Sequence, residues 1–279
     1  MAIWTFGSIN LDHVYRVPHF VAAGETLAAQ SCRVGLGGKG ANQSVAAARA
    51  GAHVRHVGAV GQDGRGALDT LQGFGVDMSH VTVGDVPTGH AIISVDPHGE
   101  NSIVIFDGAN RALNAAHLAA LGSAQPGDTL LLQNETSLQV EAAQAFAGSR
   151  IIYSAAPFDA EAVRRILPHL SLLVMNAGEA ETLRAAMGSL PQVEMVITRG
   201  AEGAEWIGAE PLRVPAFAVT AVDTTGAGDC FTGTLAAGLD HGLPPAQAMR
   251  RAAAAAALQV TRHGAADAMP TAAEVDAML

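Results

Sequence analysis

Ala221-Val222-Asp223-Thr224-Thr225-Gly226-Ala227-Gly228-Asp229-Cys230-Phe231-Thr232-Gly233 is the stretch that most narrows both the fold and the chemistry of this chain. Gly226 and Gly228 carry no Cβ, so the backbone can turn sharply there and point successive N–H groups at one spot. A helical pattern begins at the same place, and the partial positive charge of a helix N-terminus favours an anion. The stretch therefore predicts an anion hole with Asp229 beside it.

An anion hole beside a carboxylate is typical of phosphoryl transfer. In that reaction the protein mainly positions groups and neutralises charge, while a carboxylate accepts the proton of the attacking hydroxyl. Asp229 is thus the candidate general base. The alternative is that Thr224 or Thr225 only caps a helix whose first turn carries an acid.

The composition bounds the class of protein. With 279 residues and 49% hydrophobic content, the chain can bury the core of one large α/β domain. A net charge of -10 argues against a nucleic-acid surface, so an anionic substrate would rely on backbone amides and Mg²⁺. Cys32 and Cys230 have no CxxC partner, which argues against a disulfide framework or a zinc site. The sequence shows neither a signal peptide nor an apolar membrane span, so we expect a soluble cytoplasmic protein.

Apolar runs of strand length alternate with helical periodicity along the chain. The expected strands are Ile3–Ile9, Val54–Val60, Thr129–Leu132, Ile151–Ser154, Leu172–Met175 and Met195–Thr198. The expected helices are Ala41–Ala50, Gly66–Phe74, Leu138–Phe146, Ala160–Ile166, Glu179–Ala186, Ala227–Leu239 and Ala246–Val260, the last containing a six-alanine run. This alternation predicts a three-layer α/β/α domain over residues 1–279 with a mostly parallel sheet.

One segment breaks the alternation. Residues 91–95 and 101–106 are strand-like and flank the turn sequence Asp96-Pro97-His98-Gly99-Glu100, which predicts a β-hairpin. Both faces of its strands carry apolar groups, so a hairpin with one solvated face explains it poorly. We expect one face to cover a ligand and the other to meet a second subunit; simple packing on its own domain is the alternative.

A second glycine cluster, Gly35-Leu36-Gly37-Gly38-Lys39-Gly40-Ala41-Asn42-Gln43, contains G-x-G-x-x-G. A dinucleotide site would need this motif after the first strand and an acid at the end of the next, and neither condition is met. A P-loop would need Ser or Thr after Lys39. We therefore interpret the glycines as allowing close approach of backbone to a polar, uncharged ligand such as a sugar, with Lys39 and Asn42 adding hydrogen bonds.

Polar residues follow several expected strands, at the sheet edge where open α/β folds bind ligands. Asn10 and Asp12 follow the first strand, and Glu135 follows the strand ending at Leu132. They could bind hydroxyl groups, or be an Asx-turn and a helix-terminal charge. Asn176 and Glu179 open a helix, and could organise a hydrated Mg²⁺ or form an N-cap.

The next strand end reads Thr198-Arg199-Gly200-Ala201-Glu202-Gly203. Its glycines would admit a nucleotide, or only turn the chain into the strand-like segment 204–207.

Taken in order, these motifs resemble those of the ribokinase-like (PfkB) carbohydrate kinases over nearly the whole chain. The matching segments are Gly7 to His13, Gly37 to Gln43, Asn176 with Glu179, Thr198 with Gly200 and Gly203, and Asp223 to Asp229. The resemblance implies a ribokinase-like α/β fold with a small β lid near 11–34 and 88–107. Through that lid it also implies a homodimer.

The resemblance also implies a role for each matched residue. Asp229 is the base, with an anion hole from the amides of Gly226, Ala227, Gly228 and Asp229. Sugar binding falls to Asn10, Asp12, Gly38, Lys39, Asn42 and Glu135. The ATP and Mg²⁺ side is Asn176, Glu179 (through water), Thr198, Gly200 and Gly203. A monovalent cation, K⁺, matches Asp223, Thr225, Arg262 and Gly264, largely through backbone carbonyls. A Ser common in that cation site is replaced by Ala268, and the interior of the Asn176–Glu179 motif is Ala-Gly.

The expected function is ATP-dependent phosphorylation of a sugar, with the 5-hydroxyl of D-ribose as the acceptor. The alternative within the family is a nucleoside or other carbohydrate kinase. From other classes, a dinucleotide-dependent oxidoreductase leaves the stretch around Asp229 unexplained, and a non-catalytic sugar-binding protein would bind without consuming ATP.

Overall fold

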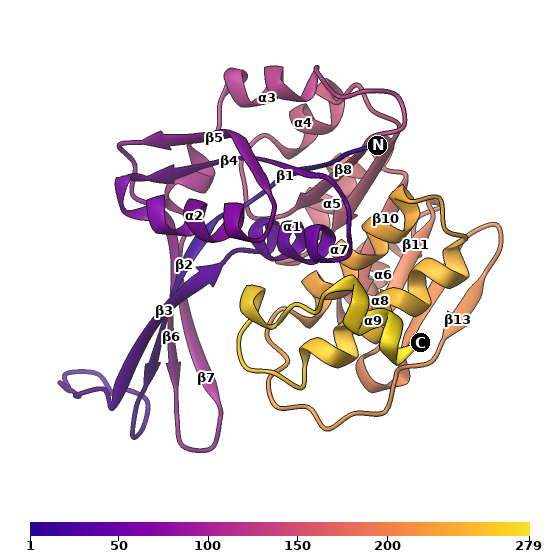
Figure 1. Cartoon of the computed structure of the whole chain (residues 1–279). Coiled ribbons are helices and arrows are strands. Elements are labelled where there is room, and N and C mark those ends of the chain that lie inside the picture. The colour runs from indigo at the N-terminus through magenta and orange to yellow at the C-terminus, as the bar shows by residue number, and fades with distance from the viewer.

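The computed structural model of the protein describes residues 1–279, and its body is a large sheet covered by helices (Figure 1). In spatial order the sheet contains β13 (Leu212–Val214), β12 (Ala204–Ile207), β11 (Met195–Thr198), β10 (Leu172–Asn176), β9 (Arg150–Ser154), β8 (Thr129–Gln133), β1 (Ile3–Phe6), β4 (Val54–Gly61) and β5 (Asp77–Gly84). All neighbours are parallel except β11–β12 and β12–β13, which are antiparallel. The expected α/β fold with a mostly parallel sheet is confirmed.

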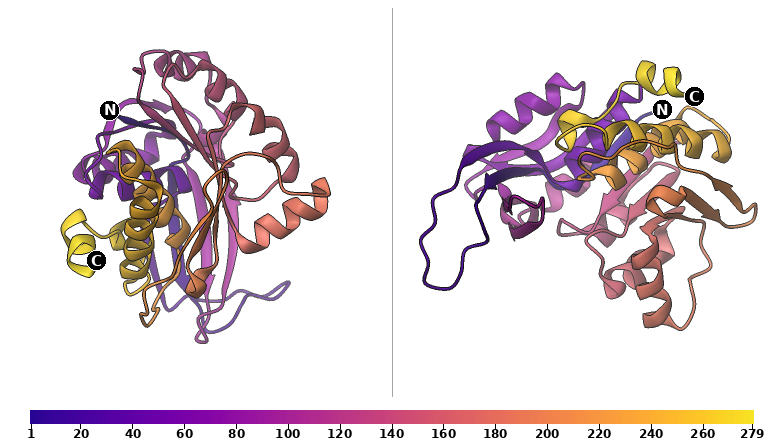
Figure 2. Two further views of the ribbon diagram at one scale, coloured as in Figure 1. Left: turned by 90° about the vertical axis from the view of Figure 1, so that its right-hand side faces the viewer. Right: turned by 90° about the horizontal axis from the view of Figure 1, so that it is seen from below.

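Helices cover both faces of this sheet (Figure 2). The helices on one face are α1 (Lys39–Arg49), α2 (Arg65–Gly73), α7 (Ala227–Asp240), α8 (Pro245–Gln259) and α9 (Ala272–Met278). Those on the other are α3 (Ala115–Leu121), α4 (Gln139–Ala145), α5 (Ala160–Ile166) and α6 (Ala177–Met187). None of the helices combines the length and the apolar character needed to cross a membrane.

Two apolar cores separate the layers, and the pleat of the strands explains both. Along β8, Leu131 contributes to the core under α1 and α7, whereas Leu130 and Leu132 contribute to the opposite core. Successive side chains point to opposite faces of a strand, so runs of apolar residues without alternation are buried on both sides. The alanine run of α8 is buried as expected, and the close approach of α7 is visible at Gly238, where an added Cβ would lie 3.0 Å from that of Ala248.

A second sheet projects from the body, at the bottom left of Figure 1. Its order is β3 (Ser31–Gly37), β2 (Asn10–Arg16), β6 (Gly89–Val95) and β7 (Asn101–Phe106). β6 and β7 form the predicted hairpin. The apolar pattern predicted no strand at β2 or β3, because their half-exposed residues lack a continuous apolar run; only the family resemblance implied a β lid near 11–34.

The first strand is shorter than the sequence predicts. Residues 3–9 were expected to form one strand, but β1 ends at Phe6 and β2, in the second sheet, begins at Asn10. Gly7 lies at the break, where an added Cβ would be 2.7 Å from Cα of Gly40 at the start of α1. The chain therefore leaves the large sheet at the point where α1 packs across its edge.

Candidate functional site

The candidate site lies at the carboxyl edge of the large sheet, beside β1. β1 stands between β8 and β4, and the chain runs outward from it in both directions. Such a reversal of strand order opens a crevice at the carboxyl ends of the strands, where α/β proteins bind ligands. The segments after β1 and β8 and the first turns of α1 and α7 meet there.

Asp229 is buried in the first turn of α7, with 6% of its surface exposed. Its Oδ2 accepts a hydrogen bond from Asn42 Nδ2 at 3.1 Å, and its Oδ1 accepts one from Gln43 Nε2 at 3.0 Å. Gln43 Oε1 in turn accepts from Gln133 Nε2 at 2.8 Å. This relay of amides fixes the orientation of the carboxylate and leaves further lone pairs on both oxygens.

The backbone before Asp229 has the form of an anion hole. Gly226 adopts a left-handed conformation (φ 79°), which an L side chain rarely adopts. The N–H groups of Gly226, Gly228 and Asp229 make no hydrogen bond within the protein. The Ala227 N–H, expected to join them, instead donates to Thr224 O at 3.2 Å, since a tight turn closes there.

Glu135 and Lys39 lie beside this hole. Glu135 Oε2 accepts from the backbone N of Lys39 at 2.9 Å and from the hydroxyl of Ser8. Burial raises the pKa of Glu135, although the ammonium of Lys39 acts against that rise. The pKa of Lys39 is itself raised, first by the charge of Asp229 and also by Glu135, Glu179 and Asp12, with burial acting in the opposite direction. One ammonium therefore lies within the field of four carboxylates.

Asn10 and Asp12, two residues apart in β2, occupy different surroundings. Asn10 Oδ1 accepts from Asn110 Nδ2 at 2.7 Å, and Asn110 Oδ1 accepts from the backbone N of Ile9 at 3.0 Å. Burial, together with the charge of Glu135, raises the pKa of Asp12 to about 6. Gly37 lies against the Asp12 carboxylate. An added Cβ at Gly37 would overlap Asp12 Oδ1, so only glycine fits at this position.

Two cavities border these residues. The larger, about 500 Å³, lies between the second sheet and the C-terminal loops and is lined by Asp12, Arg33, Ile93, Asp223 and Gly264 among others. The smaller, about 260 Å³, is lined by Asn10, Glu135, Ile105, Arg111 and Phe158 among others. The predicted sugar-binding residues are thus divided: Asp12 lines the larger cavity, and Asn10 and Glu135 line the smaller. Lys39, Asn42 and Asp229 line neither cavity; Lys39 is joined to Glu135 through its backbone N, and Asn42 to Asp229.

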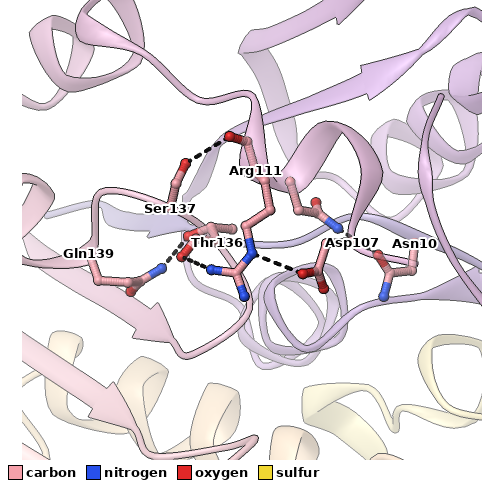
Figure 3. A network of polar contacts seen from close by, with 7 residues as sticks. Asn10, Asp107, Arg111, Thr136, Ser137 and Gln139 are labelled. Atoms are coloured by element: carbon pink, nitrogen blue, oxygen red, sulfur yellow. Dashed lines mark hydrogen bonds and ion pairs between the residues drawn. The ribbon is translucent and has the colours of Figure 1, made fainter. Parts of the chain in front are cut away.

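Arg111, which lines the smaller cavity, makes polar contacts with two segments of the chain (Figure 3). Its guanidinium donates to Asp107 Oδ2 at 3.0 Å and to the backbone O of Thr136 at 3.3 Å. Ser137 Oγ donates to the backbone O of Arg111 at 3.3 Å. These contacts tie the segment after β7 to the loop that carries Glu135.

The predicted nucleotide residues lie further along the same edge. Asn176 and Thr198 end β10 and β11 and are direct neighbours in the sheet. Asn176 caps α6: its Oδ1 accepts from Glu179 N at 2.9 Å, and Glu179 Oε2 accepts from Asn176 N at 2.8 Å. The capping alternative is therefore present in the structure, and it leaves Glu179 Oε1 free of protein donors. Burial raises the pKa of Glu179.

The two glycines after β11 differ. Gly203 has φ 101°, and an added Cβ would lie 2.7 Å from Ala216 N, so this glycine is required by the turn into β12. Gly200 (φ 55°) is exposed, and a Cβ there would meet nothing within 4 Å. Gly200 alone faces open space that a ligand could use.

The residues predicted to hold a monovalent cation lie directly behind the anion hole. Asp223 Oδ1 accepts from Thr225 N at 2.9 Å, and its Oδ2 accepts from Gly264 N at 3.0 Å. Burial acts to raise the pKa of Asp223, but these hydrogen bonds outweigh it and lower the pKa. The side chain of Arg262 points to Glu274, its partner at 2.6 Å.

Several residues of the site had no predicted role. Gln43, Ser8 and Asn110 hold Asp229, Glu135 and Asn10, and Gln259 donates to the backbone O atoms of Thr225 and Gly264. Gln43 lies in the segment Gly37 to Gln43 and Ser8 in the segment Gly7 to His13, so the family-like motifs could have indicated both residues. Asn110 and Gln259 sit outside every motif, so nothing in the sequence marks them.

Comparison with known proteins extends the likeness over the whole chain. Residues 2–272 match the model of the pfkB family carbohydrate kinases. The ribokinase of Haemophilus influenzae is 37% identical over 289 residues, which cover 95% of this chain and 94% of the relative. The Arabidopsis thaliana ribokinase complexed with ribose and ATP has a TM-score of 0.87 at 28% identity and covers 100% of this chain and 99% of its own. A Burkholderia thailandensis nucleoside kinase in complex with inosine has a TM-score of 0.86 at 26% identity, with coverages of 99% and 95%.

Proposed function

The chain belongs to the pfkB family of carbohydrate kinases, and from that premise we propose that it transfers the γ-phosphoryl group of ATP to the 5-hydroxyl of D-ribose. The observation that carries the proposal is Asp229, a buried carboxylate whose two oxygens both accept hydrogen bonds from amides, and which stands beside the unpaired backbone N–H groups of Gly226, Gly228 and Asp229 itself. The choice of ribose rests on the similarity to ribokinases.

In the proposed reaction Asp229 accepts the proton of the sugar hydroxyl as its oxygen forms a bond to the γ-phosphorus. The bond from that phosphorus to the bridging β–γ oxygen breaks, and ADP leaves with the electron pair. The free N–H groups of Gly226, Gly228 and Asp229 and the ammonium of Lys39 are positioned to stabilise the charge on the transferred group.

Sugar binding is supported by polar groups that are prepared for a ligand. Asn42 Oδ1 is buried and has no hydrogen-bond partner within the protein, which is uncommon and is corrected by a bound donor such as a sugar hydroxyl. Asp12 in the larger cavity, and Asn10 and Glu135 in the smaller, would offer further acceptors to a sugar. Gly38 (φ 90°) lets the backbone approach closely, since an added Cβ would lie 3.0 Å from Asn10 N.

ATP would lie along Asn176, Thr198 and Gly200, with Gly203 shaping the turn. The structure has no cluster of three or more His, Cys, Asp or Glu able to hold a bare metal ion. A free Oε1 on Glu179 instead fits a hydrated Mg²⁺ accompanying the nucleotide, held through water. When bound, Mg²⁺ neutralises phosphate charge. We propose a cytoplasmic location, where ATP is available.

The proposed reaction does not include a bound K⁺. The predicted cation ligands Thr225 and Gly264 already direct their carbonyls to an amide of the protein itself, Gln259 Nε2. The residues present therefore do not fit the cation, and no step depends on it.

We propose that the second sheet is a lid on the body and also the dimer contact. Register places Val34, His13, Ile92 and Val104 side by side across its four strands, so they share one face. Val34, Ile92 and Val104 are exposed by 55%, 43% and 65%. The opposite face carries Asp12, Ile93 and Ile105, which line the two cavities. An apolar outward face of this kind is typical of a protein interface.

A nucleoside kinase is the second candidate. Ile105 and Phe158 line the smaller cavity beside Asn10, and such apolar walls could receive a base. The similarity to the inosine-bound nucleoside kinase points the same way.

The test is ATP consumption with Mg²⁺ across ribose, deoxyribose, fructose, ketodeoxygluconate, adenosine and inosine, using Asp229→Asn as the blank. A ribose signal that exceeds all others and is absent from the blank supports the proposal. A nucleoside with the highest kcat/KM would transfer the mechanism to the second candidate. Binding of sugar without ATP consumption would overturn catalysis altogether.

A further inference from the structure

We propose that Gln259 is a positioning residue that takes the place of a monovalent cation behind the anion hole, so that this enzyme needs no K⁺. The inference rests on the proposed kinase function, since it concerns the loop that would stabilise the transferred phosphoryl group. It arises from an observation outside every sequence motif: a fully buried amide at the C-terminal end of α8.

The Nε2 atom of Gln259 joins two loops that are far apart in sequence. It donates to Thr225 O at 2.6 Å and to Gly264 O at 3.0 Å. Thr225 directly precedes Gly226, the left-handed residue that begins the anion hole. The next residue of the second loop, Ala265, packs on Gly226, where an added Cβ would lie 3.0 Å from the Cβ of Ala265. The amide therefore joins the loop that leads into the anion hole to the loop that packs against Gly226.

The orientation of this amide follows from the partners on each side. With Nε2 towards the loops, both N–H groups have carbonyl acceptors and one acceptor, Oε1, is left without a partner. The reversed amide would bring three oxygens together and leave two buried donors unpaired. Buried donors without partners are rarer than under-satisfied carbonyls, so the orientation with Nε2 inward is favoured in the absence of a cation.

A cation and this amide compete for one position. Backbone carbonyls bind a monovalent cation by replacing its water shell, which requires their oxygens to converge on the ion. Here the two carbonyls converge on Nε2 instead, and both oxygens of Asp223 accept backbone N–H groups. The partial positive charge of the amide hydrogens supplies, within the chain, the attraction that an ion would otherwise supply.

The first experiment uses the unmodified protein. Kinase rates and Tm are measured in KCl and in tetramethylammonium chloride at equal ionic strength. We expect the same kcat and the same Tm in both salts, because binding of an ion to the native state would raise Tm. Stimulation of kcat by K⁺, or a higher Tm in KCl, would overturn the proposal and indicate that the amide reverses to become a ligand.

The second experiment removes the amide. Without K⁺, Gln259→Ala should lower kcat about tenfold, which corresponds to a rise of about 1.4 kcal/mol in the activation free energy. The KM of either substrate should change little. KCl should restore much of that loss and raise the Tm of the variant, since the vacated position exposes two convergent carbonyls. The matched control is Gln247→Ala, an exposed glutamine on the same helix, which should respond to neither salt.

The outcomes separate this inference from the proposed function. If Gln259→Ala is folded but gains no response to K⁺ in rate or Tm, Gln259 is only structural and the inference is wrong. If the variant does not fold, the salt response of the unmodified protein still decides. If the unmodified protein phosphorylates no sugar or nucleoside in either salt, the proposed function fails, whereas the Tm comparison continues to report on the cation.

Discussion

The acceptor half and the nucleotide half of the candidate site are built differently. Around Asp229, the side chains of Asn42, Gln43 and Gln133 are buried. Asn42 and Gln43 donate hydrogen bonds to Asp229, and Gln133 donates one to Gln43, so each bond joins residues that are far apart in the sequence. At the nucleotide end, Asn176 and Gly200 are exposed, and the contacts of Asn176 are local ones within a helix cap.

The difference suggests where the protein places its rigidity. Donors and dipoles fixed before the reaction contribute most where charge develops in the transition state. A nucleotide brings its own charges and metal ion, so its half of the edge needs fewer buried partners. Substitutions in the acceptor half should therefore act on turnover, and those in the nucleotide half on ATP affinity and on local stability.

The largest effect is expected for Asp229→Asn. An amide cannot accept the hydroxyl proton, so kcat should fall by about 10² to 10⁴, as for the loss of a general base. Tm should fall only slightly, because the new NH2 group faces either Asn42 Nδ2 or Gln43 Nε2, and reversal of that partner's amide would present an oxygen to it and restore the hydrogen bond. The measurement is steady-state kinetics together with thermal unfolding.

A control for this change lies on the same helix. Asp240 is a buried carboxylate at the opposite end of α7, with 3% of its surface exposed. Asp240→Asn should retain normal kcat. Equal losses in the two variants would mean that burying an amide in α7, and not the chemistry of Asp229, causes the defect.

A smaller effect, with a dependence on pH, is expected for Asp12→Asn. Asp12 has a pKa of about 6 in the folded protein, so kcat/KM for the sugar should fall as pH decreases through that value. The variant should lose roughly 10-fold to 100-fold in kcat/KM at pH 8, the range for a hydrogen bond to a charged group, and its pH profile should lack this limb. A limb near pH 6 that persists in Asp12→Asn would assign it to another group.

The same pKa gives a prediction for stability. Because the folded-state pKa lies above the ordinary value of 3.8, the contribution of Asp12 to stability is present below that value and is lost as pH rises through about 6. Asp12→Asn should therefore have a higher Tm than the unmodified protein at pH 8, and the difference should become small near pH 4 and vanish below the ordinary pKa of 3.8. Both proteins are compared in thermal melts across this range.

Much of the acceptor half could be predicted from the sequence, because Gly226, Asp229, Asn42 and Lys39 lie in short motifs whose backbone geometry is local. The large sheet was also predictable, since its buried strands are continuous apolar runs such as Leu130 to Leu132. Both depend on residues close together in the chain.

The remainder depends on contacts between distant residues. Asn110 reaches Asn10 across 100 positions, and Gln259 reaches Thr225 across 34. Nothing in a periodicity or a motif reports which side chains will meet after folding. The early end of β1 has the same origin, because Gly7 is constrained by Gly40 on another element.

A several-fold effect on the acceptor half alone is expected from the outer face of the lid. Val104→Lys should convert a dimer to a monomer, since a charge in an apolar contact loses its hydration, and should raise the KM of the sugar several-fold while leaving that of ATP unchanged. Sedimentation velocity and kinetics measure both. Val86→Lys, at a valine exposed by 42% outside the lid, is the control and should remain dimeric. A monomeric unmodified protein would contradict the proposed contact.

The smallest effect should come from the nucleotide half. Asn176→Ala removes the side-chain acceptor that caps α6, which typically costs about 1 kcal/mol of stability. It should also raise the KM of ATP a few-fold through the freed Glu179, with kcat and the KM of the sugar nearly unchanged. Asn176→Asp keeps an acceptor at the cap and should restore the stability, so the pair separates capping from nucleotide binding. A loss of kcat in Asn176→Ala comparable to that of Asp229→Asn would mean that the two halves are not built differently, because the cap would then be coupled to the buried amides around the base.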